Sequence, residues 1–233
     1  SGFSTERKDE EHIKPNAQTD WNAPASHTNQ WQQEMFEMID RLRFYSCITT
    51  WVIFNEGWGQ HNTVEIVNKV IKYDDTRLIN GVTGWTDRGV GDMYDVHNYP
   101  VTSMILPENN GNRISVLGEF GGYGWAIKEH IWNPNMRNWG YKNIDGAMAL
   151  IDSYGRLVYD LETLIVQGLS AAVYTQTTDV EGEVNGLITY DRKVTKIPEG
   201  LLHLMHNRLY EITPAKAVTL IADSQNGSKN TRL

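Results

Sequence analysis

The chain has 233 residues, of which 40% are hydrophobic, enough for one large domain with its own core. The 21 Lys and Arg residues against 29 Asp and Glu residues give a net charge of −8. An acidic chain disfavours nucleic-acid binding, which requires a basic surface, and suits a neutral substrate. Since no apolar run approaches the roughly 20 residues that a membrane span requires, no membrane partner is expected.

Aromatic residues make up 10% of the chain, and many of them lie in polar, glycine-rich stretches. Proteins that hold sugars use aromatic faces in this way, although large aromatic residues also fill cores. Cys47 is the single cysteine, and the apolar stretch 47–52 predicts that its thiol is buried. The localisation stays unknown, with periplasmic and secreted locations among the candidates. The start at Ser1-Gly2, without a signal peptide, indicates a segment cut from a longer protein.

The first half of the chain alternates helical and strand patterns. Residues 1–28 are polar and predict a loop, and apolar residues at helical spacing then predict helices over 29–44 and 63–73. Runs rich in β-branched and aromatic residues predict strands over 48–54, 78–82 and 93–97.

The second half continues this alternation. The same patterns predict, in chain order, a strand over 114–117, a helix over 143–167, a strand over 170–175 and a helix over 199–210. The tail over 223–233 is polar and is expected to fray. Short apolar strands that alternate with helices predict an α/β fold with a parallel sheet, in which chemistry gathers at the carboxyl ends of the strands.

Two glutamates follow predicted strands and have different surroundings. Glu56 lies between the aromatic residues Phe54 and Trp58, and an apolar neighbourhood favours the protonated form that a general acid requires. Glu119 lies in the glycine-rich turn 118–122, where bare backbone lets a substrate approach, and Tyr99 is a candidate donor that keeps it ionised. Retaining hydrolysis of a glycosidic bond needs two such carboxyl groups about 5 Å apart. The alternative for either glutamate alone is a surface or salt-bridged carboxylate.

Two segments carry a resemblance to a known family. Residues 51–59, Trp-Val-Ile-Phe-Asn-Glu-Gly-Trp-Gly, resemble the acid/base motif of glycoside hydrolase family 2. Residues 116–122, Val-Leu-Gly-Glu-Phe-Gly-Gly, are similar to its nucleophile segment, and residues 186–192 resemble the stretch after its last barrel strand. The family includes β-galactosidases, β-glucuronidases and β-mannosidases, and the resemblance covers roughly residues 30–200.

The resemblance implies a TIM (β/α)8 barrel that is incomplete in this chain and contains about strands 4 to 8. The Glu56 strand would be the fourth, the His97 strand the sixth, the Glu119 strand the seventh and 170–175 the eighth. Residues 1–28 would then be a loop after the missing third strand, 29–222 a partial catalytic domain and 223–233 a tail. The expected partners are the missing barrel strands and the β-sandwich domains of the full-length protein, or a homo-oligomer that covers the open edges.

The resemblance also implies a site. Glu56 would be the acid/base and Glu119 the nucleophile of a carbohydrate-active enzyme that uses no cofactor and no metal. The expected substrate-binding residues are Asn55, Trp85, His97, Tyr99, Trp125, Tyr174 and Gln176. Tyr174 or Gln176 would stand where the eighth strand of the family often supplies a Trp.

The sequence disfavours one sugar. The Asn-x-Lys signature with which glucuronidases bind the uronate carboxylate is absent from 181–186, so the resemblance favours a neutral, galactoside-like sugar. Two alternatives stay open. The chain could be a non-catalytic carbohydrate-binding fragment. It could also be an unrelated α/β hydrolase, although its sequence lacks the Gly-x-Ser-x-Gly turn expected of that class. His61 could contact a substrate, and the pair His203 and His206 has the spacing of metal ligands but no evident third ligand.

Overall fold

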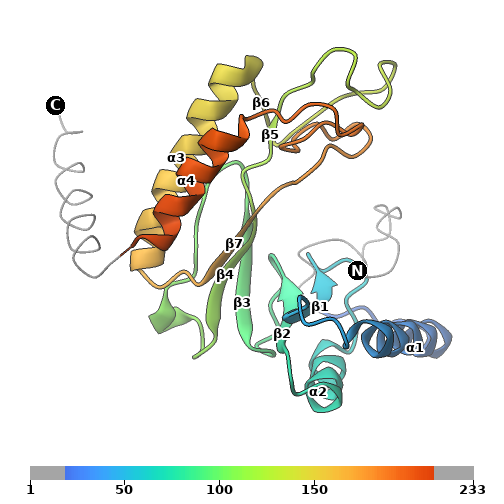
Figure 1. Cartoon of the computed structure of the whole chain (residues 1–233). Helices are drawn as coiled ribbons and strands as arrows, with labels where there is room; N and C mark the ends of the chain where they lie inside the picture. Colours follow the sequence, from blue (N-terminus) through green and yellow to red (C-terminus); the bar gives the residue numbers. More distant parts are fainter. Residues whose placement is uncertain (1–18, 213–233) are drawn as a thin grey trace. The chain divides into compact units, whose positions relative to one another are not determined.

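The computed structural model describes residues 19–212, which form two compact units (Figure 1). Unit 1 contains residues 19–97 and 107–116, and unit 2 contains residues 98–106 and 117–212. The predictions for 1–18 and for the tail 223–233 lie outside the described residues.

Unit 1 begins with a helix–strand–helix–strand segment. It consists of α1 (Ala25–Leu42), β1 (Thr50–Asn55), α2 (Thr63–Tyr73) and β2 (Leu78–Thr83). β1 and β2 are parallel and in register from Thr50 opposite Leu78 to Asn55 opposite Thr83. The helices lie against this strand pair (Figure 1). Their shared core consists of Trp31, Met35, Ile39, Trp51, Ile53, Phe54, Ile66, Val67, Val70, Ile79 and Val82.

Helix α1 starts at Ala25, so the prediction of a loop over 1–28 is wrong for residues 25–28. The carbonyl of Pro24 accepts hydrogen bonds from the backbone N–H groups of His27 and Thr28, which close the first turn. Thr28 is buried and lies on the same face as Trp31 and the rest of the apolar stripe. The helix therefore begins one turn earlier than its apolar pattern indicates.

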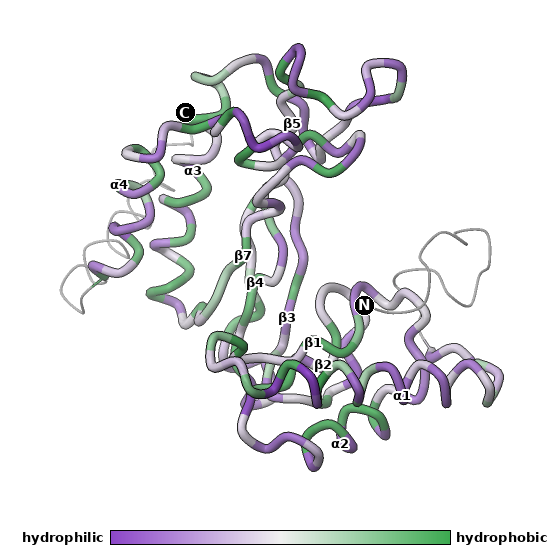
Figure 2. Tube along the Cα trace, turned by 45° about the vertical axis from the view of Figure 1, so that its right-hand side comes forward, coloured by the Kyte–Doolittle hydropathy of each residue, from purple (hydrophilic) through white to green (hydrophobic). Residues whose placement is uncertain are grey.

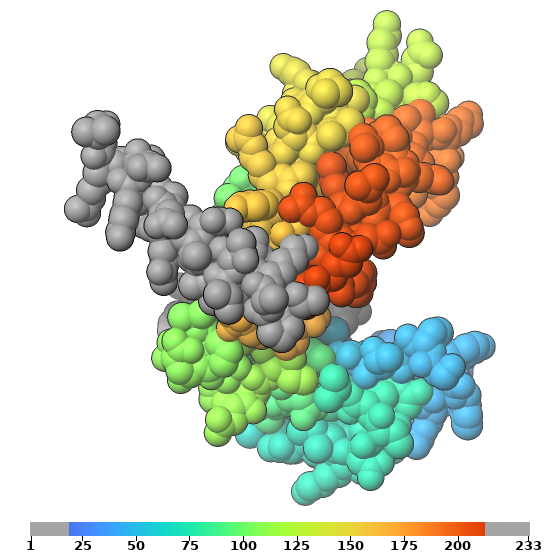
Figure 3. Space-filling model, turned by 60° about the vertical axis from the view of Figure 1, so that its left-hand side comes forward, coloured from blue at the N-terminus to red at the C-terminus, as the bar shows by residue number. Residues whose placement is uncertain are grey.

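Unit 2 is built on a pair of helices. These are α3 (Gly146–Val166) and α4 (Glu199–Tyr210), whose side chains meet in the space-filling view, in yellow and red (Figure 3). Apolar and polar residues alternate around α3 (Figure 2), and its buried face carries Leu150, Tyr154, Leu157, Val158 and Leu161. An ion pair joins the helices: Arg208 Nε lies 2.7 Å from Oε1 of the buried Glu162.

The remaining strands include two that run from unit 1 into unit 2. β3 (Met93–Asn98) and β4 (Ile114–Phe120) belong to a three-stranded sheet with the order β3-β4-β7, where β7 is Ala171–Tyr174. The 3-10 turn Pro107–Asn109 and the two-residue strands β5 (Tyr123–Gly124) and β6 (Lys142–Asn143) were not predicted. The five predicted strands and four predicted helices are confirmed within a few residues. The barrel that they would belong to stays a prediction.

One further expectation, for Cys47, has an outcome in the described residues. Cys47 is exposed, so the prediction of a buried thiol is wrong; it follows the turn after α1, before β1 begins at Thr50. Val173 in β7 is 57% exposed although it is apolar, and Ala171 and Ala172 beside it are exposed as well. Between residues 19 and 212, no helix combines the length and the apolar character needed to cross a bilayer.

Candidate active site

Glu56 stands directly after β1 in a strained conformation. Its φ of 55° lies in the left-handed region, which costs a non-glycine residue about 1–3 kcal/mol. The backbone N–H of Glu56 donates to the carbonyl of Thr83 at 2.8 Å, and the Thr83 hydroxyl donates to Asn55 Oδ1 at 2.6 Å. Thr83 of β2 thus fixes the backbone N–H of Glu56 and the side chain of Asn55 before it. Such strain is typical of functional positions, where surrounding contacts over-determine the conformation.

His97 is the hydrogen-bond partner of Glu56 within unit 1. His97 Nδ1 lies 2.7 Å from Glu56 Oε1, and the His97 side chain is fully buried while that of Glu56 is 15% exposed. The indole Nε1 of Trp85 donates to the carbonyl of His97 at 2.9 Å, and the two rings meet edge to face. His97 is therefore held at its backbone by Trp85 and at its ring by Glu56.

Gly84 makes room for this pair. Its φ is 90°, and a Cβ added there would lie 3.2 Å from both Glu56 Cγ and His97 Nδ1. Glycine is thus required twice, by the left-handed backbone and by the close approach of two side chains.

Glu119 lies near the end of β4 and has its own hydrogen-bond donor in unit 2. The hydroxyl of Tyr99 donates to Glu119 Oε2. The Tyr99 ring stacks on that of Tyr141, with the centroids 3.6 Å apart and the planes 3° from parallel. Burial, and then the nearby carboxylate of Glu119, raise the pKa of Tyr99 well above its ordinary value. Tyr99 therefore remains a hydrogen-bond donor to Glu119.

The glycines after Glu119 allow close packing of the turn. Gly121 and Gly122 have φ values of 78° and 75°. A Cβ on Gly121 would run into the ring of Tyr174, and one on Gly122 into the ring of Tyr141. The Tyr174 hydroxyl accepts from the backbone N–H of Tyr123 at 3.1 Å. Tyr174 thus supports the turn that follows Glu119.

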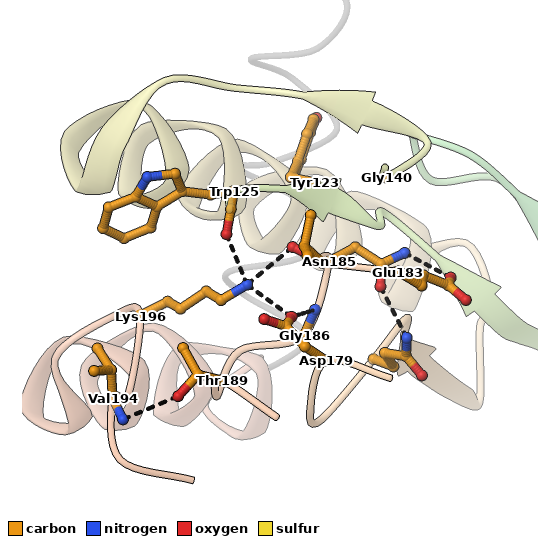
Figure 4. A network of polar contacts seen from close by, with 12 residues as sticks. Tyr123, Trp125, Gly140, Asp179, Glu183, Asn185, Gly186, Thr189, Val194 and Lys196 are labelled. Carbon is orange, nitrogen blue, oxygen red and sulfur yellow. Dashed lines mark hydrogen bonds and ion pairs between the residues drawn. The ribbon is translucent and has the colours of Figure 1, made fainter. Parts of the chain in front are cut away.

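A buried lysine joins three segments of unit 2 (Figure 4). Lys196 Nζ donates to Asp179 Oδ1 at 2.7 Å and to the carbonyls of Trp125 and Val184 at 2.9 Å each. Asp179 Oδ1 also accepts from the backbone N–H of Gly186 at 2.8 Å. Burial lowers the pKa of Lys196 and raises that of Asp179, while the contact between the two charges opposes both shifts. The carbonyl of Trp125 faces Lys196, and its indole extends away from the lysine.

The predicted site residues divide between the two units. Asn55, Glu56, Trp85 and His97 lie together in unit 1. In unit 2, Tyr99 contacts Glu119 and Tyr174 packs against Gly121, whereas Gln176 donates to Asn185 Oδ1 at 2.9 Å and Trp125 belongs to the lysine network. The distance between the two carboxyl groups stays a prediction.

The structure shows the contacts of the histidines that the sequence offered as further site residues. His61 is fully buried, its Nδ1 lies 2.8 Å from the carbonyl of Gly59, and its ring packs edge-on against Trp31 and Phe54, so it is a core residue of unit 1. His206 Nε2 lies 2.7 Å from the Tyr154 hydroxyl, and His203 Nε2 lies 3.1 Å from Asn207 Nδ2.

Sequence reasoning missed Gly84, which packs against Glu56, and Tyr141, which stacks on Tyr99. It also missed the buried polar residues Asn185 and Lys196. Only Gly84 had a readable signal, because a glycine at a strand end beside a Trp indicates a close approach.

The assignment of this site depends on the residues themselves. No protein-family model matches the chain, and no curated protein matches it either.

Proposed function

We propose that this chain carries the catalytic residues of a retaining β-glycosidase, with Glu56 as the acid/base and Glu119 as the nucleophile. The observation that carries the proposal is that each glutamate stands at the end of a strand with a hydrogen-bond partner of its own. Glu56 pairs with His97, and Glu119 accepts from Tyr99. A retaining mechanism needs one carboxyl group that exchanges a proton and one that stays ionised, and the two settings differ in this sense.

In the first step, the Glu119 carboxylate attacks the anomeric carbon while the bond to the leaving oxygen breaks. Glu56 donates its proton to that oxygen, so the products are the free aglycone and a glycosyl ester of Glu119. In the second step, Glu56 removes a proton from water, the water oxygen attacks the anomeric carbon, and the ester bond breaks. Two inversions at one carbon give net retention. Tyr99 stabilises the carboxylate of Glu119 at the start and at the end of the cycle.

The proposed substrate is a neutral sugar with a terminal β-linkage, similar to a galactoside. The loop after β7 offers acidic side chains rather than a cation for a uronate: Asn185 Nδ2 donates to Glu183 Oε1, and Lys196 is buried and paired with Asp179. An aryl β-galactoside is therefore expected to be turned over faster than the matching aryl β-glucuronide. The opposite preference would contradict this choice of sugar.

The decisive experiment traps the intermediate in the full-length protein. A 2-deoxy-2-fluoro β-glycoside with an activated leaving group should inactivate the protein and add one sugar mass, which peptide mapping should place on Glu119. Glu119→Gln should abolish labelling, and Glu108→Gln, which changes an exposed glutamate of the 3-10 turn, should not. Labelling at another residue, or an inverted product by NMR, would reject the assignment.

The role of Glu56 has a separate signature. Glu56→Ala should keep much of its activity toward glycosides with activated leaving groups, since these need little protonation, and lose it toward alkyl glycosides. Azide should then give a β-glycosyl azide with this variant. If both leaving-group classes decline equally, Glu56 is not the acid.

A further inference from the structure

A second buried carboxylate lies at the far nitrogen of His97. Asp95 Oδ1 is 4.0 Å from His97 Nε2, and the two side chains are 1% and 0% exposed. Both residues belong to β3 and are two positions apart, so their side chains leave the same face of the strand. The amide Nδ2 of Asn80 donates to Asp95 Oδ2 at 2.6 Å, which fixes the carboxyl group from β2.

The imidazole of His97 therefore lies between two carboxyl groups, with Glu56 at Nδ1 and Asp95 at Nε2. An ionised carboxylate only accepts hydrogen bonds, whereas an imidazole donates only from a nitrogen that carries a proton. Asp95 is therefore an acceptor facing a proton on Nε2, whereas Glu56 can accept from Nδ1 when ionised or donate to it when protonated. Enzymes often orient a histidine with a hydrogen-bonded carboxylate behind the ring, whereas Asp95 Oδ1, at 4.0 Å, acts on Nε2 through its charge.

We propose that Asp95 is a positioning residue that acts on the acid/base Glu56 through His97. Asp95 favours a proton on Nε2, which fixes the ring with Nδ1 toward Glu56 Oε1 and leaves the other carboxyl oxygen, Oε2, to exchange protons with the leaving group and with water. This role rests on the proposed glycosidase function, whereas the protonation of His97 is a property of the ligand-free protein.

The kinetic test compares Asp95→Asn with the wild type in the full-length protein. The variant keeps the size of the side chain and removes its charge. For an alkyl β-glycoside, whose leaving oxygen needs a proton, kcat should fall about 10- to 100-fold, as expected for impaired general acid catalysis. For a dinitrophenyl glycoside, kcat for the glycosylation step should change less than threefold. A purely structural role would lower both rates by the same factor and would overturn the proposal.

Asp74→Asn is the matched control. Asp74 is another fully buried carboxylate of unit 1 and accepts from Trp51 Nε1 at 2.9 Å. Its amide variant should show no dependence on the leaving group, although it too loses a buried charge. A leaving-group dependence as large as that of Asp95→Asn would mean that the effect follows from general destabilisation, and would overturn the proposal.

The second measurement needs no substrate and no variant. In 15N-histidine-labelled protein at neutral pH, ring correlations of His97, assigned through its backbone, should show hydrogen on Nε2. A His97 ring with a bare Nε2 in the wild type would overturn the role of Asp95 even if the protein is a glycosidase. Conversely, absence of glycosidase activity from the wild type would reject the proposed function and leave the ring measurement to decide the Asp95–His97 contact.

Discussion

Replacing Gly84 by alanine tests whether the spacing of Glu56 and His97 matters for activity. The new Cβ would lie 3.2 Å from Glu56 Cγ and from His97 Nδ1, so both side chains must shift by a few tenths of an ångström. A displacement of about 1 Å in a catalytic group can cost about 100-fold in rate, so we expect a decrease in kcat of about tenfold for alkyl glycosides. That decrease corresponds to about 1.4 kcal/mol in the activation free energy.

Gly84→Ala also places a side chain at a φ of 90°, which should cost about 1–3 kcal/mol of folding stability. Gly89→Ala separates this cost from the steric effect. Gly89 has a φ of 68° in the same unit, but an added Cβ would meet no atom within 4 Å. The control should therefore lose similar stability in urea unfolding and keep its kcat. If Gly84→Ala retains the wild-type kcat, or if both variants lose activity in proportion to stability, the contact between Glu56 and His97 does not control the reaction.

Three further predictions follow from the same contacts. Tyr99→Phe keeps the stacking on Tyr141 but removes the hydrogen-bond donor to Glu119. In rate measurements kcat should fall about 10- to 100-fold. In urea unfolding the free energy of unfolding should change by less than about 1 kcal/mol. Lys196→Met leaves the buried Asp179 without its cation and should lower the free energy of unfolding by about 3–5 kcal/mol; a loss below about 1 kcal/mol would contradict this. Burial opposes the depressed pKa of Asp74, but hydrogen bonds from Thr76 and Trp51 and the charge of Arg77 lower it from 3.8 to about 2. The pKa of Asp74 is lower in the folded than in the unfolded protein, so its ionised carboxylate contributes about 2 kcal/mol to the free energy of unfolding above about pH 4. This contribution is lost as the pH falls toward 2. Unfolding curves of Asp74→Asn should lack that part of the pH dependence.

The secondary structure could be predicted because the apolar patterns have a direct physical cause. Residues 63–73 carry apolar side chains at helical spacing, and Ile66, Val67 and Val70 form the buried face of α2. The β-branched and aromatic run before Asn55 is the buried strand β1. The start of α1 was missed because polar residues do not reveal which backbone carbonyl closes the first turn. Cys47 was misassigned because an apolar neighbour in the sequence need not be a neighbour in space.

The glutamates could be identified from the sequence, but their partners could not. Glu56 and Glu119 follow strand patterns and occur in distinctive local motifs, whereas Asp95 and Tyr141 lie in segments without such a motif. Their roles depend on contacts across the fold: Asp95 with Asn80 at a separation of 15 residues, and Tyr141 with Tyr99. The spacing of residues along the sequence does not predict such contacts.

The two glutamates are supported by different kinds of chemistry, and this difference bears on their roles. Glu56 contacts a histidine nitrogen that can either donate to a carboxyl oxygen or accept from it. Glu119 contacts a tyrosine whose raised pKa keeps it a donor throughout. A group that exchanges protons benefits from a partner that can donate or accept, whereas a nucleophile needs a constant donor. If the two roles were exchanged, the glutamate that gives up a proton would be Glu119, whose partner Tyr99 only donates. The assignment of Glu56 as acid/base and Glu119 as nucleophile therefore agrees better with the partner of each residue.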